Sequence, residues 1–248
     1  MADGLNATRQ TVILAAGQGS RLLPGHPGTP KPLVPVGGRP LIEHALWQAE
    51  AAGCTEAIVI IGSRAEELRA HLASVETTLR LQLVHNPDFS LPNGISLLAA
   101  EPYAAERFFV QMADHVFSAP VLRQLEAEDP ALDGLPRLLV DCAPEGIDVE
   151  DATKVRIVGR RITAIGKQIS PWDAFDTGCF RLDHRIFGAL REAAAEAPPT
   201  LSAGMTRLAT AGLLVPVALE GVRWADVDTS GDRNRAETLQ QALDHAEG

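Results

Sequence analysis

The chain has few cysteines and no long apolar run, and each shortage excludes a class of protein. Its three cysteines in 248 residues lie far apart without CxxC spacing, so neither a disulfide framework nor a zinc site is expected. No apolar run approaches the length of about 18 residues that a membrane span needs, and residues 1–10 lack the apolar core of a signal peptide. We therefore expect a cytoplasmic protein with reduced thiols and no direct membrane insertion.

Positive charge is also scarce. Lys and Arg together number 22 against 32 Asp and Glu, which gives a net charge of −10, and the only lysines are Lys31, Lys154 and Lys167. No acidic residue lies between Gly4 and Ile42, although four basic residues do. A cationic, glycine-rich stretch in an acidic protein favours a local site for a small anion, whereas nucleic acid would need a wider basic face. Nucleic acid is therefore not expected as a partner.

Short apolar runs alternate with amphipathic stretches in the first half of the chain, which is typical of parallel βαβ units with helices on both faces of the sheet. The pattern predicts strands at 10–15, 56–62, 79–85 and 108–112, with helices at 40–52 and 63–73. The second half is less regular. It predicts a β-hairpin of 154–159 and 161–166, strands at 177–182 and 213–219, and helices at 183–196, 200–211 and 231–246. Together these elements predict a single α/β domain.

The most informative segment is a glycine-rich loop after the first predicted strand. It reads Leu14-Ala15-Ala16-Gly17-Gln18-Gly19-Ser20-Arg21-Leu22 and is followed by Pro30-Lys31. A Walker A loop needs Gly-Lys before Ser or Thr, and a dinucleotide fingerprint needs a small residue where Leu22 stands and an acidic residue about twenty positions later. Both are missing. We expect the amides at Gly17 and Gly19 to wrap an anion, with charge from Arg21 and Lys31; a solvated loop that needs glycine only for turning is the alternative.

This loop resembles the signature loop of the nucleotidyltransferases, which join a nucleoside triphosphate to a phosphorylated sugar or alcohol and release pyrophosphate. The resemblance implies that Leu14, Ala15, Ala16, Gly17, Gln18, Gly19, Ser20 and Arg21 bind the nucleotide, and that Lys31 lies near the reacting phosphates. With the alternating pattern, it implies a Rossmann-like three-layer αβα domain with a mainly parallel central sheet and a β-hairpin extension over the active site. This nucleotidyltransferase domain is expected over residues 10–248, after a flexible segment at 1–9.

Carboxylates for a metal are expected in two places. Asp114 follows the strand that ends at Met112, and it should lie at the carboxyl edge of the sheet, where ligands bind in open α/β folds. Trp224-Ala225-Asp226-Val227-Asp228-Thr229 offers two more, and alternation points Asp226 and Asp228 to one side of an extended segment. Mg²⁺ takes one or two protein carboxylates plus phosphate oxygens, so Asp114 is a predicted metal ligand, and either Asp226 or Asp228 is expected to be the second. Helix capping by Asp114 or Asp228 is the alternative.

Further stretches narrow the family resemblance to cytidylyltransferases. Asn86-Pro87 through Leu91-Pro92-Asn93-Gly94-Ile95-Ser96 resembles the segment around the base, which implies that Asn93, Gly94 and Ser96 bind the nucleotide. An Asn amide offers both a donor and an acceptor to a pyrimidine edge, although helix capping by Asn93 explains it almost as well. Asp114-His115-Val116-Phe117-Ser118, residues 151–155 with 165–167, and Asp176-Thr177-Gly178 are most similar to cytidylyltransferases that act on inositol 1-phosphate.

The resemblance implies that Lys154, Lys167, Asp176 and Thr177 bind the acceptor; a hairpin with exposed lysines and a turn-forming Asp is the alternative. It also implies that CMP passes from CTP to inositol 1-phosphate in a Mg²⁺-dependent in-line transfer, with Arg21, Lys31 and Asp114 as the catalytic residues. Because the attacking phosphate is already ionised, His115 has no proton to remove and is interpreted as structural. We expect the CDP-inositol to be used by a separate membrane alcohol phosphotransferase.

Several alternatives stay open at this point. Phosphocholine, aminoethylphosphonate and a sugar 1-phosphate are alternative acceptors. An amine acceptor needs an aromatic or acidic cage for its cation, and the chain has only one Tyr and three Trp. A non-catalytic nucleotide-binding regulator is a second class of function, and a nicotinamide-dependent oxidoreductase is a third. The sequence leaves a homodimer open.

Overall fold

The computed structural model describes residues 8–19, 28–126, 132, 134–143 and 147–244. The strands of its central sheet are β1 (Gln10–Leu14), β4 (Glu56–Ile61), β5 (Arg80–His85), β6 (Arg107–Met112), β8 (Arg137–Asp141), β9 (Lys154–Val158), β10 (Arg161–Gly166), β11 (Ala174–Asp183) and β12 (Val215–Ala218). Two short pairs, β2 (Pro35–Val36) with β3 (Arg39–Pro40) and β7 (His115–Phe117) with β13 (Trp224–Asp226), lie outside it. The helices are α1 (Leu41–Ala52), α2 (Ala65–Leu72), α3 (Asn93–Ala99), α4 (Arg185–Ala194), α5 (Leu201–Thr210) and α6 (Ser230–Asp244), with short 3-10 turns η2 (Lys31–Leu33), η3 (Glu101–Tyr103) and η4 (Leu122–Glu126).

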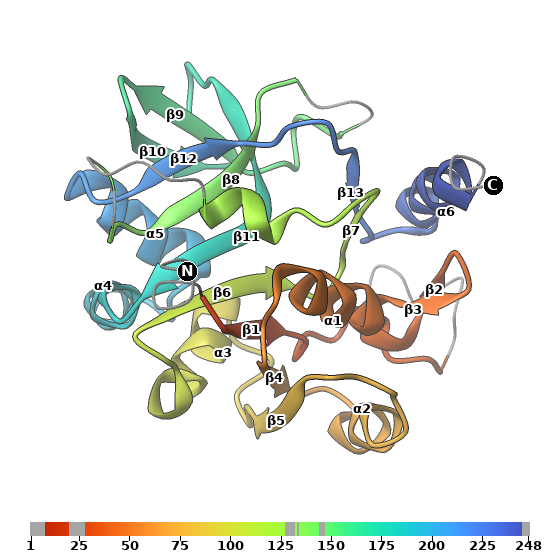
Figure 1. The fold of residues 1–248 in the computed structure, drawn as a ribbon. Coiled ribbons are helices and arrows are strands. Elements are labelled where there is room, and N and C mark those ends of the chain that lie inside the picture. Colours follow the sequence, from red (N-terminus) through yellow and green to blue (C-terminus); the bar gives the residue numbers. More distant parts are fainter. Residues whose placement is uncertain (1–7, 20–27, 127–131, 133, 144–146, 245–248) are drawn as a thin grey trace, which may run out of the picture.

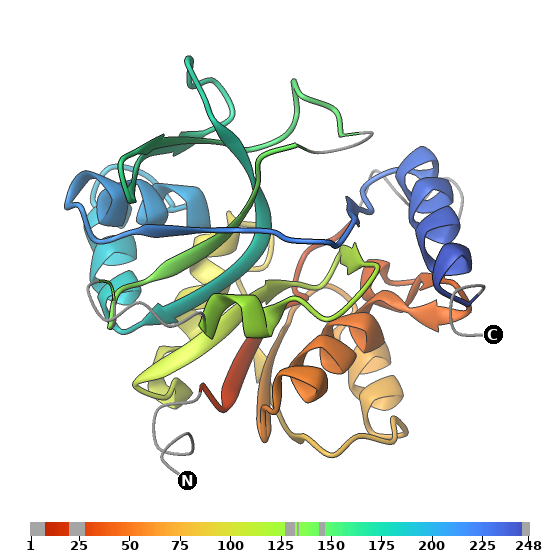
Figure 2. The same ribbon diagram turned by 45° about the horizontal axis from the view of Figure 1, so that its top comes forward.

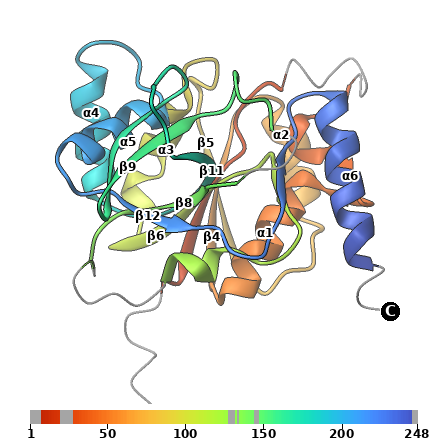
Figure 3. The same cartoon turned by 90° about the horizontal axis from the view of Figure 1, so that it is seen from above.

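Parallel strands form the centre of the sheet. In the described residues, the order β10-β9-β11-β6-β1-β4-β5 places β6, β1, β4 and β5 side by side and parallel. Side chains alternate along each strand, so Val12 and Leu14 pack into the core under α3, α4 and α5, whereas Ile13 and Ala15 pack under α1 and α2. Helices therefore cover both faces (Figure 3), which explains why these strands read as continuous apolar runs. The predicted three-layer α/β fold is confirmed.

The second half of the chain extends the sheet with antiparallel strands. Strand β11 pairs antiparallel with β6, β8 and β9, and β12 adds to β8 in parallel. The predicted hairpin forms as β9 and β10, which rise above the main sheet (Figure 1). The pairing of β11 with β8 shifts between Asp176 and Phe180, and Gly178 there has φ +73°. A left-handed glycine at a register shift is a β-bulge, and it bends β11 beside the predicted acceptor residues.

Helix α6 stands apart from the two helical layers, beside β2, β3 and β13 (Figures 1 and 2). Arg233 Nε donates to Pro35 O at 3.0 Å, and Gln240 Nε2 donates to Phe117 O at 3.1 Å. A small core that includes Val36, Val116 and Ala236 lies beneath. These contacts hold α6 against β2 and β7, and the acidic segment at 226–228 leads directly into this helix.

The predicted elements agree with the structure to within a few residues at their ends, but some elements were not assigned from the sequence. These are α3, β8, the two short strand pairs and the 3-10 turns η2, η3 and η4. Among the described residues, no helix has both the length and the apolar character needed to cross a bilayer. The boundary expected at residue 10 stays a prediction, because residues 1–7 lie outside the described ranges.

Candidate active site

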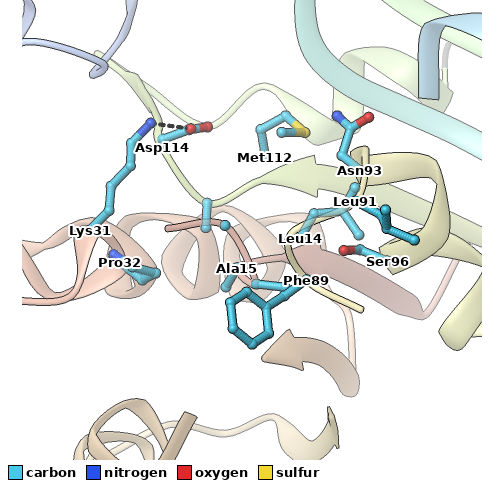
Figure 4. Close-up of a pocket in the computed structure, with 13 residues that line it drawn as sticks. Leu14, Ala15, Lys31, Pro32, Phe89, Leu91, Asn93, Ser96, Met112 and Asp114 are labelled. Carbon is cyan, nitrogen blue, oxygen red and sulfur yellow. Dashed lines mark hydrogen bonds and ion pairs between the residues drawn. The ribbon is translucent and has the colours of Figure 1, made fainter. Parts of the chain in front are cut away.

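A cavity of about 250 Å³ opens at the carboxyl ends of β1 and β6. One wall is the start of the glycine-rich loop, and another comes from α3 and the segment before it (Figure 4). Its lining residues are Leu14, Ala15, Ala16, Gly17, Lys31, Pro32, Phe89, Leu91, Asn93, Ser96, Met112, Ala113 and Asp114. Most residues predicted to bind the nucleotide are therefore gathered around one cavity.

The described part of the glycine-rich loop leaves β1 with its backbone anchored. Ala15 N donates to Ile60 O at 3.0 Å, and Ala16 O accepts from Ser63 N at 2.9 Å. Gly19 has φ +62°, and a Cβ there would lie 2.3 Å from Lys31 Cβ, so glycine is needed for the lysine stem to pass. A Cβ at Gly17 would meet nothing within 4 Å. The predicted nucleotide contacts at Ser20 and Arg21 lie outside the described residues.

Lys31 brings two distant carboxylates together. Its side chain is buried, and Nζ donates to Asp114 Oδ2 at 2.5 Å and to Asp228 Oδ1 at 2.6 Å. These partners lie 83 and 197 residues away in the sequence. Burial alone would lower the pKa of Lys31, but the carboxylates of Asp114 and Asp228 outweigh it and raise the pKa above its usual value. Lys31 is therefore a fixed cation.

Asp114 is ionised because it pairs with Lys31, and His115 is its second partner. Burial would raise the pKa of Asp114, but the Lys31 ammonium and the His115 ring hold it well below the usual range. His115 Nδ1 lies 2.9 Å from Asp114 Oδ1, so both oxygens of Asp114 are held. Burial would lower the pKa of His115, but the nearby carboxylates of Asp226 and Asp114 raise it to about 9.

Asp226 completes the acidic cluster. Its Oδ1 is buried and has no hydrogen-bond partner among the residues that the structure describes. Burial raises the pKa of Asp226 to about 6, and the carboxylates of Asp114 and Asp228 add to the increase. Single ligand atoms from Asp114, His115 and Asp226 lie within 4.8 Å of one another. An unpaired buried carboxylate oxygen is costly, and a hard divalent cation is the partner that such oxygen donors fit.

The alternative of helix capping fails at both carboxylates. No helix begins after Asp114, because β7 follows it directly. At the start of α6, Thr229 and Asp232 bond to each other reciprocally: Thr229 N donates to Asp232 Oδ2 at 2.7 Å and Asp232 N donates to Thr229 Oγ1 at 3.2 Å. Asp228 Oδ1 is therefore available to Lys31.

On the opposite side of the cavity, polar groups of α3 are aimed by bonds to their neighbours. Asn93 is not the cap of α3; its Oδ1 accepts from Leu201 N at 2.8 Å, which leaves its amide NH₂ as the donor on the cavity side. Ser96 Oγ accepts from Asn86 Nδ2 at 3.0 Å. Gly94 does not line the cavity. A Cβ there would lie 2.4 Å from Pro199 O, so Gly94 allows α3 to pack against the start of α5.

A second, larger cleft of about 1430 Å³ lies beyond the carboxylates and shares Asn93 and Met112 with the first cavity. Its lining includes His115, Asp226 and Asp228, so the acidic cluster stands at the border between the two spaces. Two of the residues predicted to bind the acceptor, Lys167 and Asp176, line this cleft. Burial raises the pKa of Asp176 to about 6, and Lys167 Nζ pairs with Asp151.

The other two residues predicted to bind the acceptor do not reach the cleft with their polar groups. Lys154 Nζ donates to Lys167 O at 2.7 Å and to Ala152 O at 3.2 Å, which ties β9 to the segment after β10. Thr177 is fully buried, and its Oγ1 donates to Leu139 O at 2.8 Å. Both side chains instead support the walls of the cleft.

Several residues around these spaces were not predicted from the sequence. Phe89, Leu91 and Pro32 form apolar walls of the first cavity, and an apolar wall is the usual lining beside a few polar groups in a ligand site. Asp141 lines the larger cleft and accepts from Trp224 Nε1 at 2.9 Å. The sequence contains a signal for Asp141, because this residue ends a short apolar run just as Asp114 follows one.

Part of the chain matches a known protein family, and most of it matches curated proteins. Residues 11–131 match the family model of the MobA-like NTP transferase domain. A protein of Rubrobacter xylanophilus named bifunctional IPC transferase and DIPP synthase is 35% identical over 229 residues, which cover 92% of this chain and 51% of the relative. A protein of the same name from Aquifex aeolicus is 32% identical over 226 residues, covering 91% and 50%. The chain thus spans about half the length of these curated relatives.

A similar fold is found among solved structures. The inositol-1-phosphate CTP transferase from T. maritima superimposes with a TM-score of 0.85 over 96% of each chain, at 22% identity. A putative glucose-1-phosphate thymidylyltransferase from Bacillus anthracis gives 0.82 at the same identity, over 94% of this chain and 95% of that one. The solved structures show a shared fold, and the family model matches residues 11–131 as a MobA-like NTP transferase domain.

Proposed function

We propose that this protein transfers CMP from CTP to inositol 1-phosphate and releases pyrophosphate. The observation that carries the proposal is the cluster of Lys31, Asp114 and Asp228 at the border of two spaces, one suited to a nucleotide and one to an acceptor. The printed names of the relatives, which include an inositol-1-phosphate CTP transferase of the same fold, favour this substrate pair. The other acceptors named above stay alternatives within the same reaction.

The nucleotide is proposed to occupy the smaller cavity. The triphosphate would lie along the amides of the glycine-rich loop, toward Lys31, where backbone N–H groups and a fixed cation meet anionic oxygens. The base would lie toward α3, against Phe89 and Leu91. Asn93 has its Oδ1 engaged by Leu201, so its NH₂ group is available to donate to an acceptor such as O2 or N3 of cytosine.

The acidic cluster is proposed to hold Mg²⁺. Asp114, Asp226 and Asp228 supply oxygen donors, and the unpartnered buried Oδ1 of Asp226 is the specific feature that fits a cation. When bound, the ion would neutralise charge on the phosphate oxygens of the nucleotide. Lys31 holds Asp114 and Asp228 in place from the loop side.

The reaction is proposed to be a direct in-line displacement. A phosphate oxygen of the acceptor forms a bond to the α-phosphorus of CTP as the bond to pyrophosphate breaks. The acceptor phosphate is already an anion, so the protein needs to orient it and balance its charge rather than remove a proton. Lys167 and Asp176 are proposed to contact the acceptor, because they line the larger cleft. We further propose that a membrane alcohol phosphotransferase uses the CDP-inositol.

A substrate panel tests the proposal. CTP, UTP, ATP and GTP are each combined with inositol 1-phosphate, phosphocholine, 2-aminoethylphosphonate and glucose 1-phosphate, and pyrophosphate release is followed with Mg²⁺ present and after chelation. We expect CTP with inositol 1-phosphate to give the highest kcat/KM, with loss of turnover on chelation. Asp114→Asn serves as the inactive control. Absence of turnover with CTP and every acceptor would refute the proposal, and CTP binding without turnover would favour a regulator.

A further inference from the structure

His115 lies beside the acidic cluster of Asp114, Asp226 and Asp228, and the proposed reaction gives it no role. It follows Asp114 directly and lines the larger cleft, but an ionised acceptor gives it no proton to take. Its ring is nevertheless held on several sides. Three contacts confine the ring, and they come from β11, from β13 and from the turn between β6 and β7.

The first contact is with Gly178 of β11, which leaves a notch for the His115 ring. A Cβ at Gly178 would lie 2.8 Å from His115 Cδ2 and 2.9 Å from His115 Nε2. Gly178 also has φ +73°, at the register shift of β11. The bulge and the missing side chain together leave room for the imidazole ring against the strand.

The second contact lies on the facing strand. β13 pairs antiparallel with β7, with Asp226 opposite His115 and Trp224 opposite Phe117, so Trp224 reaches the His115 ring diagonally on the same face. The two rings stack with centroids 5.5 Å apart and planes within 10°. Trp224 is itself oriented, because its Nε1 donates to Asp141 Oδ2 at 2.9 Å. The ring of His115 is thus fixed in plane and in position.

The third contact is the bond to Asp114. His115 Nδ1 donates to Asp114 Oδ1 at 2.9 Å, while Lys31 holds Oδ2. A carboxylate at a strand end is free to rotate about its side-chain torsions, and bonds to both of its oxygens remove that freedom. Partners that orient a metal ligand in this way are worth about 10- to 100-fold in metal affinity or activity.

We propose that His115 is a positioning residue that fixes the orientation of the Asp114 carboxylate toward the cation, and that Gly178, Trp224 and Asp141 hold His115 in place for this task. The inference rests on the metal part of the proposed function. His115 acts through Nδ1 and is not itself a ligand in this proposal, since Nδ1 is occupied by Asp114, Nε2 lies against Gly178 of β11, and Mg²⁺ takes oxygen donors. The geometry explains why a glycine and a tryptophan flank a histidine that does no acid-base chemistry.

Mn²⁺ binding tests the proposal without depending on turnover. The full chain is titrated with Mn²⁺ alone, and the free ion is measured by its electron paramagnetic resonance signal. His115→Ala is expected to weaken Mn²⁺ binding by about 10- to 100-fold. His115→Asn, whose Nδ2 can replace the ring Nδ1–H as donor, is expected to retain most of the affinity. His71→Asn, on α2, is the control for loss of a histidine elsewhere and should bind as the wild type does.

A second pair of variants tests the notch without changing His115. Gly178→Ala should weaken Mn²⁺ binding as His115→Ala does, because its Cβ displaces the ring. Gly159→Ala carries the same kind of backbone strain at φ +60° with nothing within 4 Å of its Cβ, and it should leave Mn²⁺ binding unchanged. Thermal melting of each variant identifies any that fails to fold.

The outcomes separate this proposal from the proposed function. Wild-type affinity in both folded His115→Ala and Gly178→Ala would overturn it. So would a directly coordinated imidazole nitrogen in the electron spin-echo modulation of the Mn²⁺ complex, since His115 would then be a ligand. Failure of the wild type to bind Mn²⁺ would overturn the metal part of the proposed function, and this proposal with it. The substrate panel decides independently whether CMP is transferred.

Discussion

Replacement of Gly19 by alanine tests whether the glycine-rich loop exists to seat Lys31. The new Cβ would lie 2.3 Å from Lys31 Cβ and 2.9 Å from its Cδ. Carbon atoms in contact prefer about 3.5 Å or more, so the lysine stem or the loop must move by about 1.2 Å. A displacement of about 1 Å in a catalytic group can cost on the order of 100-fold in rate. We expect kcat/KM for CTP to fall by about that factor.

The same change also strains the backbone. Gly19 has φ +62°, and a residue with a side chain costs about 1–2 kcal/mol in that region. In a chain of this size each kcal/mol lowers Tm by about 2–4 °C, so a fall of about 2–8 °C is expected. Strain must therefore be separated from displacement of Lys31.

Gly28→Ala provides that separation. Gly28 has φ +88°, but a Cβ there meets nothing within 4 Å, so the variant carries the strain without the collision. Both variants are compared by thermal melting and by pyrophosphate release with CTP and inositol 1-phosphate. We expect similar losses of Tm and a loss of kcat/KM only in Gly19→Ala. If Gly19→Ala turns over as fast as Gly28→Ala, then the placement of Lys31 does not depend on Gly19 and the reasoning is wrong.

Three further predictions concern the cluster and the core. Lys31→Arg should lower kcat/KM by about 100-fold, because a branched guanidinium displaces both carboxylates. Arg69→Lys, on the surface of α2, is the control and should change kcat/KM little. Equal activities of the two variants would contradict this prediction. Asp226→Asn should weaken Mn²⁺ binding without lowering Tm, since it removes a buried charge that no hydrogen bond compensates; a large fall in Tm would contradict it. Gly94→Ala should cost about 1–3 kcal/mol of stability by overpacking against Pro199 O. Gly188→Ala, in α4 with open space, should stabilise by about 0.5–1 kcal/mol in the same melting experiment, and the opposite order would refute the packing argument.

The fold was predictable where side-chain pattern alone decides the structure. Strands β1, β4 and β6 are buried on both faces, so they read as apolar runs, and α1 between β1 and β4 begins after Pro40 and ends at Gly53. β8 was missed although Leu138, Leu139 and Val140 form such a run, because its pairing with β11 and β12 is set by distant segments. Short strands such as β7 and β13 have too few residues to show a period.

The candidate site was predictable where topology fixes position. Because parallel strands end at one edge of the sheet, the glycine-rich loop and Asp114 had to lie close together. The alternation of side chains along β11 also indicates which of its residues face the cleft. Asp176 and Gly178 are two residues apart and face the cleft, so Thr177 between them points to the opposite face and bonds to Leu139 O. The meeting of Lys31 with Asp228 depends on α6 docking, which no local pattern reveals.

The three lysines of the chain have different structural roles. Lys31 meets two carboxylates from different directions in a space narrowed by Gly19, where a compact ammonium fits and a planar fork does not. Lys154 bonds to two backbone carbonyls, one of them that of Lys167, so it shapes the segment that carries Lys167. Only Lys167 has a half-exposed side chain at the cleft, and it pairs there with Asp151. Under the proposed function, an anionic acceptor would compete with Asp151 for the Lys167 ammonium. The proposed lysine contact to the acceptor phosphate therefore falls on Lys167 rather than on Lys154.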